Sequence, residues 1–299
     1  MDITAHLRGV WAALLTPLTD DARPDLDALH KHTAGLVETG VHGVVPLGTT
    51  GEFCEFSAVE RAEIVRTTAE AAGERVPVLA GVTALSLTQT LRHIDDAKAA
   101  GADAALVLPP LYWKLDENGI HDYFATIATS SSLPVVAYDY PALTGQKIPV
   151  AVLRRLAAEQ PNVAGVKLTV RDLFEITSVV AAVKAERPDF RMVTGFEDLL
   201  PAALHAGADG AISGMANFCA DLLLEIHREV REPGQRLAAA LAELTALFGV
   251  YGLSSPPILA LKAAAEATGH PMAVRARAPG GDPDSVRAAA RKLLGGRAW

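Results

Sequence analysis

The stretch Val163-Ala164-Gly165-Val166-Lys167 shows the repeating feature that decides the fold, a short apolar and β-branched run that ends in a polar residue. An amphipathic stretch with helical spacing, Arg171–Lys184, follows this run. The same succession of run, stop and amphipathic stretch recurs along the chain. The eight runs are Gly9–Leu15, Gly43–Leu47, Pro77–Ala80, Ala104–Leu108, Pro134–Tyr138, Val163–Lys167, Phe190–Thr194 and Gly210–Ser213.

The segments between the runs predict helices, and Ser57 with Glu60 three residues later is typical of a capping box at the start of one of them. The runs are almost continuously apolar, which indicates strands covered on both faces and therefore a parallel sheet. Eight strand–helix units predict an α/β fold, the (β/α)8 TIM barrel. A doubly wound open sheet is the alternative, but no glycine-rich dinucleotide fingerprint follows the first run. The other predicted helices are Asp25–Thr39, Ser57–Gly73, Ser86–Ala100, Glu117–Ser130, Pro149–Glu159 and Glu197–Ala206.

The strand pattern stops after Ser213. The remaining sequence predicts four helices, of which the first closes the barrel. We therefore expect a catalytic barrel over residues 1–231 and a C-terminal helical extension over 232–299, divided at the turn Glu232-Pro233-Gly234. Arg275–Pro283 has little apolar content and predicts a loose loop. The four helices are Leu222–Arg231, Gln235–Phe248, Pro257–Thr268 and Pro283–Leu294.

The composition excludes several classes of protein. The 299 residues include 27 Lys and Arg against 35 Asp and Glu, a net charge of −8, which disfavours nucleic acid and membrane surfaces as partners. The two cysteines, Cys54 and Cys219, are too few for a disulfide scaffold. The first residues, MDITAHLRGVW, lack the pattern of a signal peptide, and no apolar run reaches about 18 residues. We expect a cytoplasmic protein.

Lys167 is the most informative residue at a predicted strand end, where barrel enzymes place their catalytic groups. A neutral lysine amine in an apolar barrel mouth can attack a ketone, and the resulting iminium accepts electrons when a neighbouring carbon–carbon bond breaks. A lysine that extends from the rim into water is the alternative. Tyr138 ends the neighbouring strand, and a phenol can donate and accept the protons that such chemistry moves. Its alternative is a strand-end residue with its hydroxyl in water.

The loop Gly48-Thr49-Thr50-Gly51 can offer backbone N–H groups and two hydroxyls to an anion such as the carboxylate of a 2-oxo acid, although a plain turn is the alternative. The nine histidines have no paired spacing at strand ends, so we expect them to be solvent-facing or hydrogen-bonded and we expect no metal site. The sequence also lacks a Gly-x-Ser-x-Gly elbow and a phosphate-binding loop. We expect no cofactor.

Three motifs together resemble the family of dihydrodipicolinate synthase and N-acetylneuraminate lyase, the class I pyruvate-dependent aldolases. The resemblance covers essentially the whole chain and implies that Lys167 forms an imine and Tyr138 relays protons. It implies that Thr49 and Thr50 hold the substrate carboxylate. Tyr112 is similar to a second family tyrosine near a subunit interface, and the resemblance implies a homotetramer built as a dimer of dimers. The motifs are Gly48-Thr49-Thr50-Gly51-Glu52, Tyr138-Asp139-Tyr140-Pro141-Ala142-Leu143-Thr144-Gly145 and Gly165-Val166-Lys167.

The resemblance also bears on the second half of the substrate. Dihydrodipicolinate synthases have an arginine for a carboxylate where this chain has Leu143, and the segments 110–114 and 138–146 are more similar to 2-keto-3-deoxy sugar-acid aldolases. Glu197 and Asp198 match the place where sialic-acid lyases bind substrate hydroxyls, since carboxylates accept hydrogen bonds well. An acidic pair favoured by a helix dipole is the alternative. Further sugar contacts are expected at Thr169, Ser213 and Gly214.

Two departures from the family pattern leave the imine chemistry intact. Asp139 stands where asparagine is common, and we expect it to add negative charge near the site. Leu168 stands where a polar residue is usual. We expect a lyase that reversibly cleaves a 2-keto-3-deoxy sugar acid to pyruvate and an aldehyde. A dehydratase that uses the same imine and 4-hydroxy-tetrahydrodipicolinate synthase remain alternatives. A non-catalytic 2-oxo-acid binding protein is the alternative from another class, and the retention of both Lys167 and Tyr138 argues against it.

Overall fold

The computed structural model describes residues 1–232 and 234–295. Pro233 of the predicted turn and residues 296–299 of the predicted extension lie outside the described residues. Eight parallel strands in the order β2-β1-β8-β7-β6-β5-β4-β3 form the centre of the molecule. A parallel bridge between Val44 and Val78 joins the two ends of this order and closes the barrel. The strands are β1 (Gly9–Ala13), β2 (Gly43–Val45), β3 (Leu79–Gly81), β4 (Ala104–Val107), β5 (Val135–Asp139), β6 (Val163–Leu168), β7 (Arg191–Thr194) and β8 (Gly210–Ser213).

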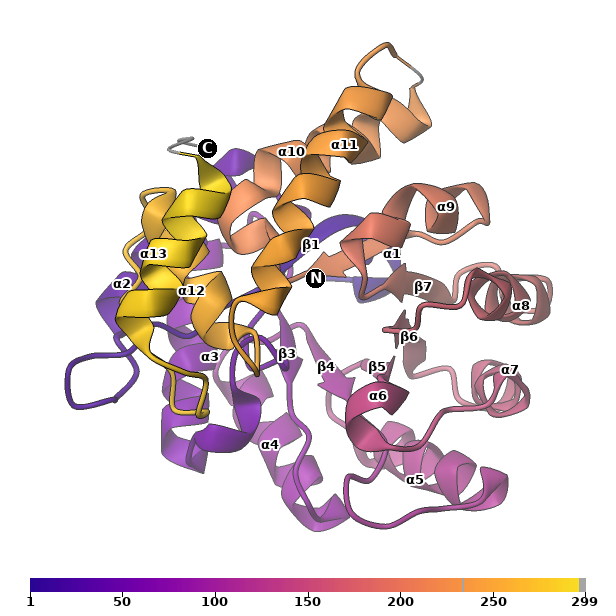
Figure 1. Ribbon diagram of the computed structural model, residues 1–299. Coiled ribbons are helices and arrows are strands. Elements are labelled where there is room, and N and C mark those ends of the chain that lie inside the picture. Colours follow the sequence, from indigo (N-terminus) through magenta and orange to yellow (C-terminus); the bar gives the residue numbers. More distant parts are fainter. Residues whose placement is uncertain (233, 296–299) are drawn as a thin grey trace.

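Helices surround the strands, as Figure 1 shows. The predicted (β/α)8 barrel is therefore confirmed, and so is the capping box, because the Ser57 side chain accepts from Glu60 N while the Glu60 side chain accepts from the Ser57 backbone. The helices are α1 (Ile3–His6), α2 (Leu26–Thr39), α3 (Ala58–Ala72), α4 (Leu87–Ala99), α5 (Glu117–Ser130), α6 (Pro141–Thr144), α7 (Val150–Glu159), α8 (Leu173–Lys184), α9 (Leu200–His205), α10 (Ala216–Arg231), α11 (Leu237–Leu247), α12 (Ile258–Ala267) and α13 (Pro283–Leu294). Short 3₁₀ turns are η1 (Phe53–Glu55), η2 (Glu197–Leu199) and η3 (Phe248–Gly252).

Buried apolar residues form two separate clusters, one inside the barrel and one between the strands and the helices. Trp11, Val136 and Ile212 belong to the inner cluster, which also includes Ile3 of α1. Val135 and Ala137, which alternate with Val136 along β5, belong to the outer cluster. This alternation follows from the two-residue period of a strand, and it fills the barrel with side chains below the end where the strands terminate.

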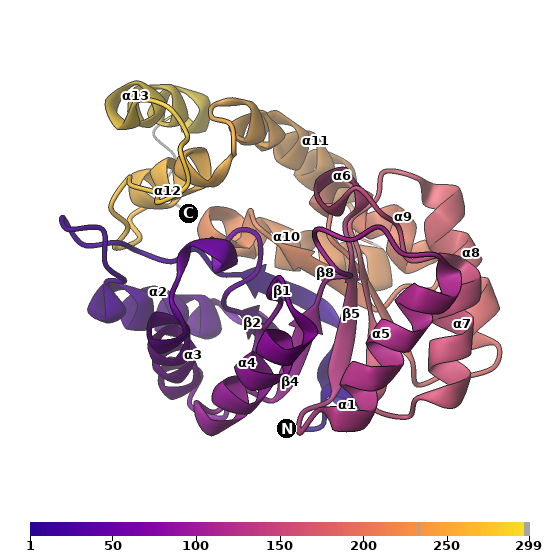
Figure 2. The same cartoon turned by 90° about the horizontal axis from the view of Figure 1, so that it is seen from below.

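The C-terminal helices α11, α12 and α13 lie at the end of the barrel where α6 follows β5, opposite the N-terminus (Figure 2). They therefore stand over the carboxyl ends of the strands. Helix α10 begins at Ala216, earlier than predicted, and Cys219 interrupts it with non-helical φ and ψ angles of −143° and 43°. None of the helices in residues 1–232 and 234–295 is long and apolar enough to span a membrane.

The predicted loose loop Arg275–Pro283 is irregular but firmly attached. The Arg275 guanidinium donates to Thr19 O at 2.8 Å, and the backbone N–H groups of Arg277 and Ala278 both donate to Glu52. The Arg277 side chain also pairs with Glu60 on α3. The expectation of a loose segment was wrong, because buried hydrogen-bond partners replace the apolar contacts that its sequence lacks.

Candidate active site

Lys167 and Tyr138 lie side by side at the carboxyl ends of β6 and β5. Strand register pairs the two residues directly. Both side chains point into the barrel, because Val166 and Leu168 on either side of Lys167 belong to the outer apolar cluster. Lys167 is 5% exposed and Tyr138 is 3% exposed, and the Lys167 Nζ atom lies 4.3 Å from the centroid of the Tyr138 ring. The amine is thus held in a desolvated position against an aromatic face.

A cavity of about 490 Å³ opens above Lys167. Residues from several strand ends line it together with residues of η3, α12 and the segment between them, so the C-terminal extension supplies part of its wall. A pocket of this size can enclose a small sugar acid. The lining residues are Ala13, Thr49, Thr50, Tyr138, Tyr140, Leu143, Lys167, Thr169, Arg171, Gly195, Phe196, Ile212, Gly214, Phe248, Tyr251, Ser255, Pro256, Pro257, Ile258 and Leu261.

Two glycines in the cavity wall make room for the polar groups around them. A Cβ atom on Gly195 would lie 1.9 Å from Thr169 Oγ1 and 3.1 Å from Lys167 Cε. A Cβ atom on Gly214 would lie 3.0 Å from the Tyr251 hydroxyl and 3.4 Å from Thr50 Oγ1. A side chain at Gly195 would therefore collide with Thr169 beside the amine, and one at Gly214 would press on the Tyr251 hydroxyl.

The loop Gly48–Glu52 folds into a compact turn next to Tyr138. Gly51 N donates to Gly48 O, and Glu52 N donates to Thr49 O, each at 3.1 Å. The Thr49 hydroxyl lies 3.4 Å from the Tyr138 hydroxyl, and both threonines line the cavity. The turn therefore presents two hydroxyls to the same space as the Lys167 amine.

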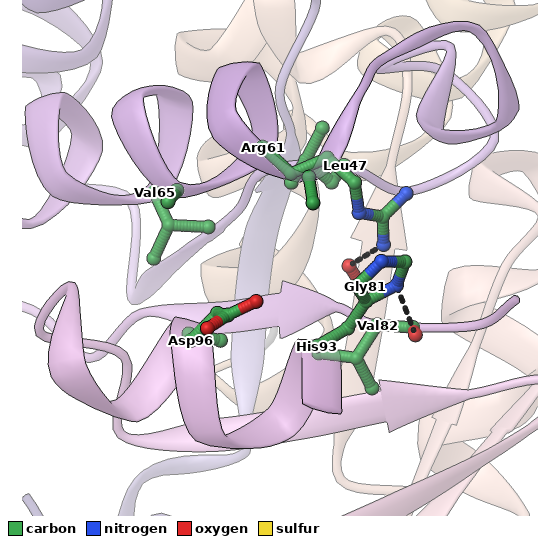
Figure 3. A pocket seen from close by; sticks show the side chains of 10 residues that line it. Leu47, Arg61, Val65, Gly81, Val82, His93 and Asp96 are labelled. Carbon is green, nitrogen blue, oxygen red and sulfur yellow. Dashed lines mark hydrogen bonds between the residues drawn. The ribbon is translucent and has the colours of Figure 1, made fainter. Parts of the chain in front are cut away.

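Buried Arg61 on α3 supports this loop from below. Its guanidinium donates to Phe53 O, one residue beyond the loop, and to Gly81 O at the end of β3. Figure 3 shows Arg61 beside His93, whose Nδ1 lies 3.2 Å from Val82 O, in a small gap between α3 and α4. Burial lowers the pKa of Arg61 to about 10, so it remains a cation that holds one carbonyl oxygen at the start of η1 and one at the end of β3.

Glu52 ties the loop to the C-terminal extension through a fully buried ion pair. Its Oε1 accepts from Lys262 Nζ at 2.7 Å, and both side chains are 0% exposed. Its Oε2 accepts from the N–H groups of Arg277 at 2.8 Å and Ala278 at 3.0 Å. Burial lowers the pKa of Lys262, and the nearby Glu52 carboxylate opposes that effect. Lys262 directly follows Leu261 of the cavity wall.

Glu197 is buried behind the cavity wall and is not among the lining residues. Its Oε1 accepts hydrogen bonds from Ser213 Oγ at 2.8 Å, from Met215 N at 3.1 Å and from the Tyr251 hydroxyl at 2.8 Å. Burial, followed by the charge of Glu197, raises the pKa of Tyr251 well above its usual value. The acidic group predicted to meet substrate hydroxyls therefore orients Tyr251, which itself lines the cavity, and Ser213 is likewise absent from the lining.

Asp198 also lies outside the lining of the cavity, and its Oδ2 pairs with Arg171 Nη1 at 2.6 Å. Tyr112 is 74% exposed and forms an edge-to-face contact with Trp113 at 5.0 Å between ring centroids. Of the residues predicted for the site, the cavity thus brings together Lys167, Tyr138, Thr49, Thr50, Thr169 and Gly214. Direct substrate contact by Tyr112, Glu197, Asp198 and Ser213 remains a prediction.

The two departures from the family pattern both face away from the cavity. Leu168 packs in the outer apolar cluster, where a leucine suits its surroundings. Asp139 is fully buried behind β5, its Oδ1 accepts from Ile148 N at 3.1 Å, and burial raises its pKa to about 7. The expectation that Asp139 adds charge near the site was wrong, because the strand period turns it outward from Tyr138.

The histidines lie outside the cavity lining. Burial lowers the pKa of His32 to about 4, and its ring nitrogens lie 2.8 Å from Asn217 Oδ1 and 3.1 Å from His270 Nδ1. His227 departs from the prediction, because its Nε2 is buried with no hydrogen-bond partner. Across residues 1–232 and 234–295, no group of three or more His, Cys, Asp and Glu side chains is arranged to hold a metal ion.

Sequence reasoning missed part of the cavity wall. Tyr140 stacks on Tyr138 with 6.0 Å between ring centroids, and burial raises its pKa. The place of Tyr140 in the motif that begins at Tyr138 could have indicated that it lines the cavity. Arg171, Phe248 and Tyr251 come from a loop and from the extension, and no local pattern in the sequence indicates that these segments meet.

Comparison with known proteins gives a consistent set of relatives. YagE of Escherichia coli K12, a putative 2-dehydro-3-deoxy-D-gluconate aldolase, is 32% identical over 98% of this chain and 98% of its own length. YjhH of the same organism, a probable 2-dehydro-3-deoxy-D-pentonate aldolase, is 33% identical over 84% of each chain. The 4-hydroxy-tetrahydrodipicolinate synthase of Methanospirillum hungatei is 36% identical over 86% of this chain and 88% of its own.

The fold agrees with that of YagE in three dimensions. The crystal structure of YagE in complex with pyruvate superposes with a TM-score of 0.92 and 30% sequence identity, covering 97% of this chain and 98% of YagE. The model of the dihydrodipicolinate synthetase family matches residues 6–290, which include both the barrel and most of the C-terminal helices. The chain belongs to the dihydrodipicolinate synthetase family.

Proposed function

We propose that the chain is a class I aldolase that reversibly cleaves a 2-keto-3-deoxy sugar acid to pyruvate and an aldehyde. The observation that carries the proposal is the buried Lys167 amine, held 4.3 Å from the Tyr138 ring at the bottom of a cavity of about 490 Å³. The names of YagE, a putative 2-dehydro-3-deoxy-D-gluconate aldolase, and of YjhH, a probable 2-dehydro-3-deoxy-D-pentonate aldolase, support the choice of substrate class.

Lys167 attacks the C2 carbonyl of the substrate, and loss of water gives a protonated imine. The hydroxyls of Thr49 and Thr50, with the N–H groups of their turn, hold the C1 carboxylate. Tyr138 takes the proton of the C4 hydroxyl, and the electrons of the C3–C4 bond move into the iminium as the aldehyde leaves. The enamine then gains a proton at C3, and water releases pyruvate and regenerates the amine.

Several residues act through others in this account. Glu197 orients Tyr251 and Ser213, and Glu52 with Lys262 fixes the threonine loop. We assign residues 1–231 to a catalytic barrel and residues 232–299 to a C-terminal extension, of which Phe248, Tyr251 and residues 255–258 and 261 line the cavity. The exposed rings of Tyr112 and Trp113 on the segment after β4 suit a subunit contact, and we expect a homotetramer in the cytoplasm, which sedimentation velocity and cell fractionation can test.

The function is tested by incubating the protein with a panel of 2-keto-3-deoxy aldonic and aldaric acids and following pyruvate and aldehyde together. We expect equimolar release of the two products from at least one member. Loss of water without pyruvate would indicate the dehydratase. Activity limited to pyruvate plus aspartate semialdehyde would indicate 4-hydroxy-tetrahydrodipicolinate synthase and contradict the proposal.

A further inference from the structure

The cavity contains two charged side chains, and both are cations. Lys167 and Arg171 line it, whereas no Asp or Glu of residues 1–232 and 234–295 is among its lining residues. In the proposed function, Lys167 forms the imine with the substrate. Arg171 is left without a role there, although it follows Lys167 by only four residues, in the loop between β6 and α8.

The guanidinium of Arg171 packs against two aromatic rings. Its central carbon lies 4.2 Å from the ring centroid of Phe196 and 5.1 Å from that of Phe248, two rings that also line the cavity. The Nη1 atom of Arg171 donates a hydrogen bond to Asp198 Oδ2 at 2.6 Å. A guanidinium has five N–H donors, so this contact leaves the other nitrogens of Arg171 available. The side chain is 50% exposed, which places it at the rim of the cavity while Lys167 lies at its bottom.

A single small molecule can reach both cations. Four residues of extended chain span at most about 14 Å, and the side chains of Lys167 and Arg171 line the same cavity. When the 2-oxo end of a substrate is bound to Lys167, the other end of the substrate therefore lies near Arg171. Leu143 also lines the cavity and offers no charge, so Arg171 is the cation that the far end meets.

The donors and acceptors of the wall favour an anion at this far end. A polyol tail needs acceptors for its hydroxyl protons, but neither Glu197 nor Asp198 lines the cavity. One oxygen of Glu197 accepts from Tyr251 and Ser213, one oxygen of Asp198 accepts from Arg171, and the second oxygen of each carboxylate is buried. A carboxylate only accepts, and it pairs with a planar guanidinium through two parallel hydrogen bonds. The wall thus matches a carboxylate better than a neutral chain of hydroxyls.

We infer that Arg171 forms a second carboxylate subsite, so that the substrate is a 2-keto-3-deoxy sugar acid with a carboxylate at each end. The aldehyde released is then itself a carboxylic acid. This inference rests on the proposed aldolase function and narrows it from sugar acids in general to the dicarboxylic ones. Asp198 acts as a positioning residue that holds the guanidinium between the two rings.

The test runs the reaction in the direction of condensation, with pyruvate and matched aldehydes. Glyoxylate is paired with glycolaldehyde, and succinic semialdehyde with butanal, so that each pair has equal length and differs in the carboxylate. We expect wild-type kcat/KM to favour the carboxylate member of each pair by about 10- to 100-fold, the range of a hydrogen bond to a charged group. Glyceraldehyde 3-phosphate with glyceraldehyde forms a third pair.

Arg171→Gln should lower that preference ratio by about 10- to 100-fold, and Arg171→Lys should restore part of it because the charge remains without the bidentate geometry. Arg154→Gln, which changes an exposed arginine on α7, should leave the ratio unchanged. Equal use of both members of each pair by the wild type, or an unchanged ratio in Arg171→Gln, would overturn the inference. A larger preference for the phosphate pair would overturn the assignment to a carboxylate.

Borohydride trapping with pyruvate separates this inference from the function on which it rests. A pyruvyl adduct on Arg171→Gln at the wild-type level, together with a lost preference for carboxylates, supports the subsite and shows that the variant is folded. An adduct on the wild type without any preference for carboxylates overturns the subsite alone. The absence of an adduct on the wild type would overturn both.

Discussion

Removing the charge of Lys262 should expose how strongly the threonine loop depends on the C-terminal extension. Lys262→Met keeps a long unbranched side chain but leaves the Glu52 carboxylate buried with only the two backbone donors, at 2.8 and 3.0 Å. Breaking a buried ion pair by removing one partner costs about 3–5 kcal/mol. We expect a loss of this size in the free energy of unfolding, measured by urea denaturation.

The matched controls separate the buried charge from lost packing. Glu52→Gln combined with Lys262→Met removes both charges while the amide can still accept from Arg277 N, so the double variant should be more stable than Lys262→Met alone. Arg154→Met breaks an exposed pair with Glu186 and should cost less than about 1 kcal/mol. The reasoning would be refuted if Lys262→Met lowered the free energy of unfolding no more than Arg154→Met does. It would also be refuted if the loss in the double variant equalled the sum of the losses in Glu52→Gln and Lys262→Met.

Three further predictions concern single residues. Tyr138→Phe should lower kcat by about 10²- to 10⁴-fold in cleavage assays because it removes the proton relay, whereas Tyr123→Phe on α5 should leave kcat near the wild-type value; equal kcat in the two variants would count against the relay. Gly195→Ala should abolish most cleavage because its Cβ would lie 1.9 Å from Thr169 Oγ1, while Gly35→Ala, with nothing within 4 Å, should remain active; an active Gly195→Ala enzyme would contradict the steric argument. Asp139→Asn removes a carboxyl whose pKa burial raises from 3.8 to about 7. Between these values the folded chain keeps a proton that the unfolded chain loses, so this group makes the wild-type stability fall as pH rises from about 4 to about 7. The unfolding free energy of Asp139→Asn, measured across this pH range, should not show the decrease that Asp139 causes in the wild type. The same pH dependence in the variant and in the wild type would contradict this prediction.

Much of the barrel could be predicted from the sequence because its strands are local apolar runs with clear ends. The run Ala104–Leu108 corresponds to β4, which ends at Val107, and Gly210–Ser213 is β8 without change. Lys167 and Tyr138 could be placed together because neighbouring parallel strands end at the same edge of a barrel. Period-two alternation then turns both side chains inward.

The rest of the site depends on contacts between distant parts of the chain. Glu52 and Lys262 are 210 residues apart, and no local pattern indicates that a buried acid at a loop meets a buried base on a late helix. The same holds for Tyr251, which reaches Glu197 across 54 residues. The position of Asp139 could have been predicted, because the two-residue period of a strand directs its carboxyl to the face opposite that of its neighbour Tyr138.

Trapping of the imine on Lys167 tests the central claim most directly. The protein is treated with pyruvate and sodium borohydride, and the intact mass and the modified peptide are measured for the wild type and for Lys167→Ala. We predict a reduced pyruvyl adduct on the wild type that maps to Lys167 and is absent from the variant. No adduct on the wild type, or an adduct that persists in Lys167→Ala, would contradict the account.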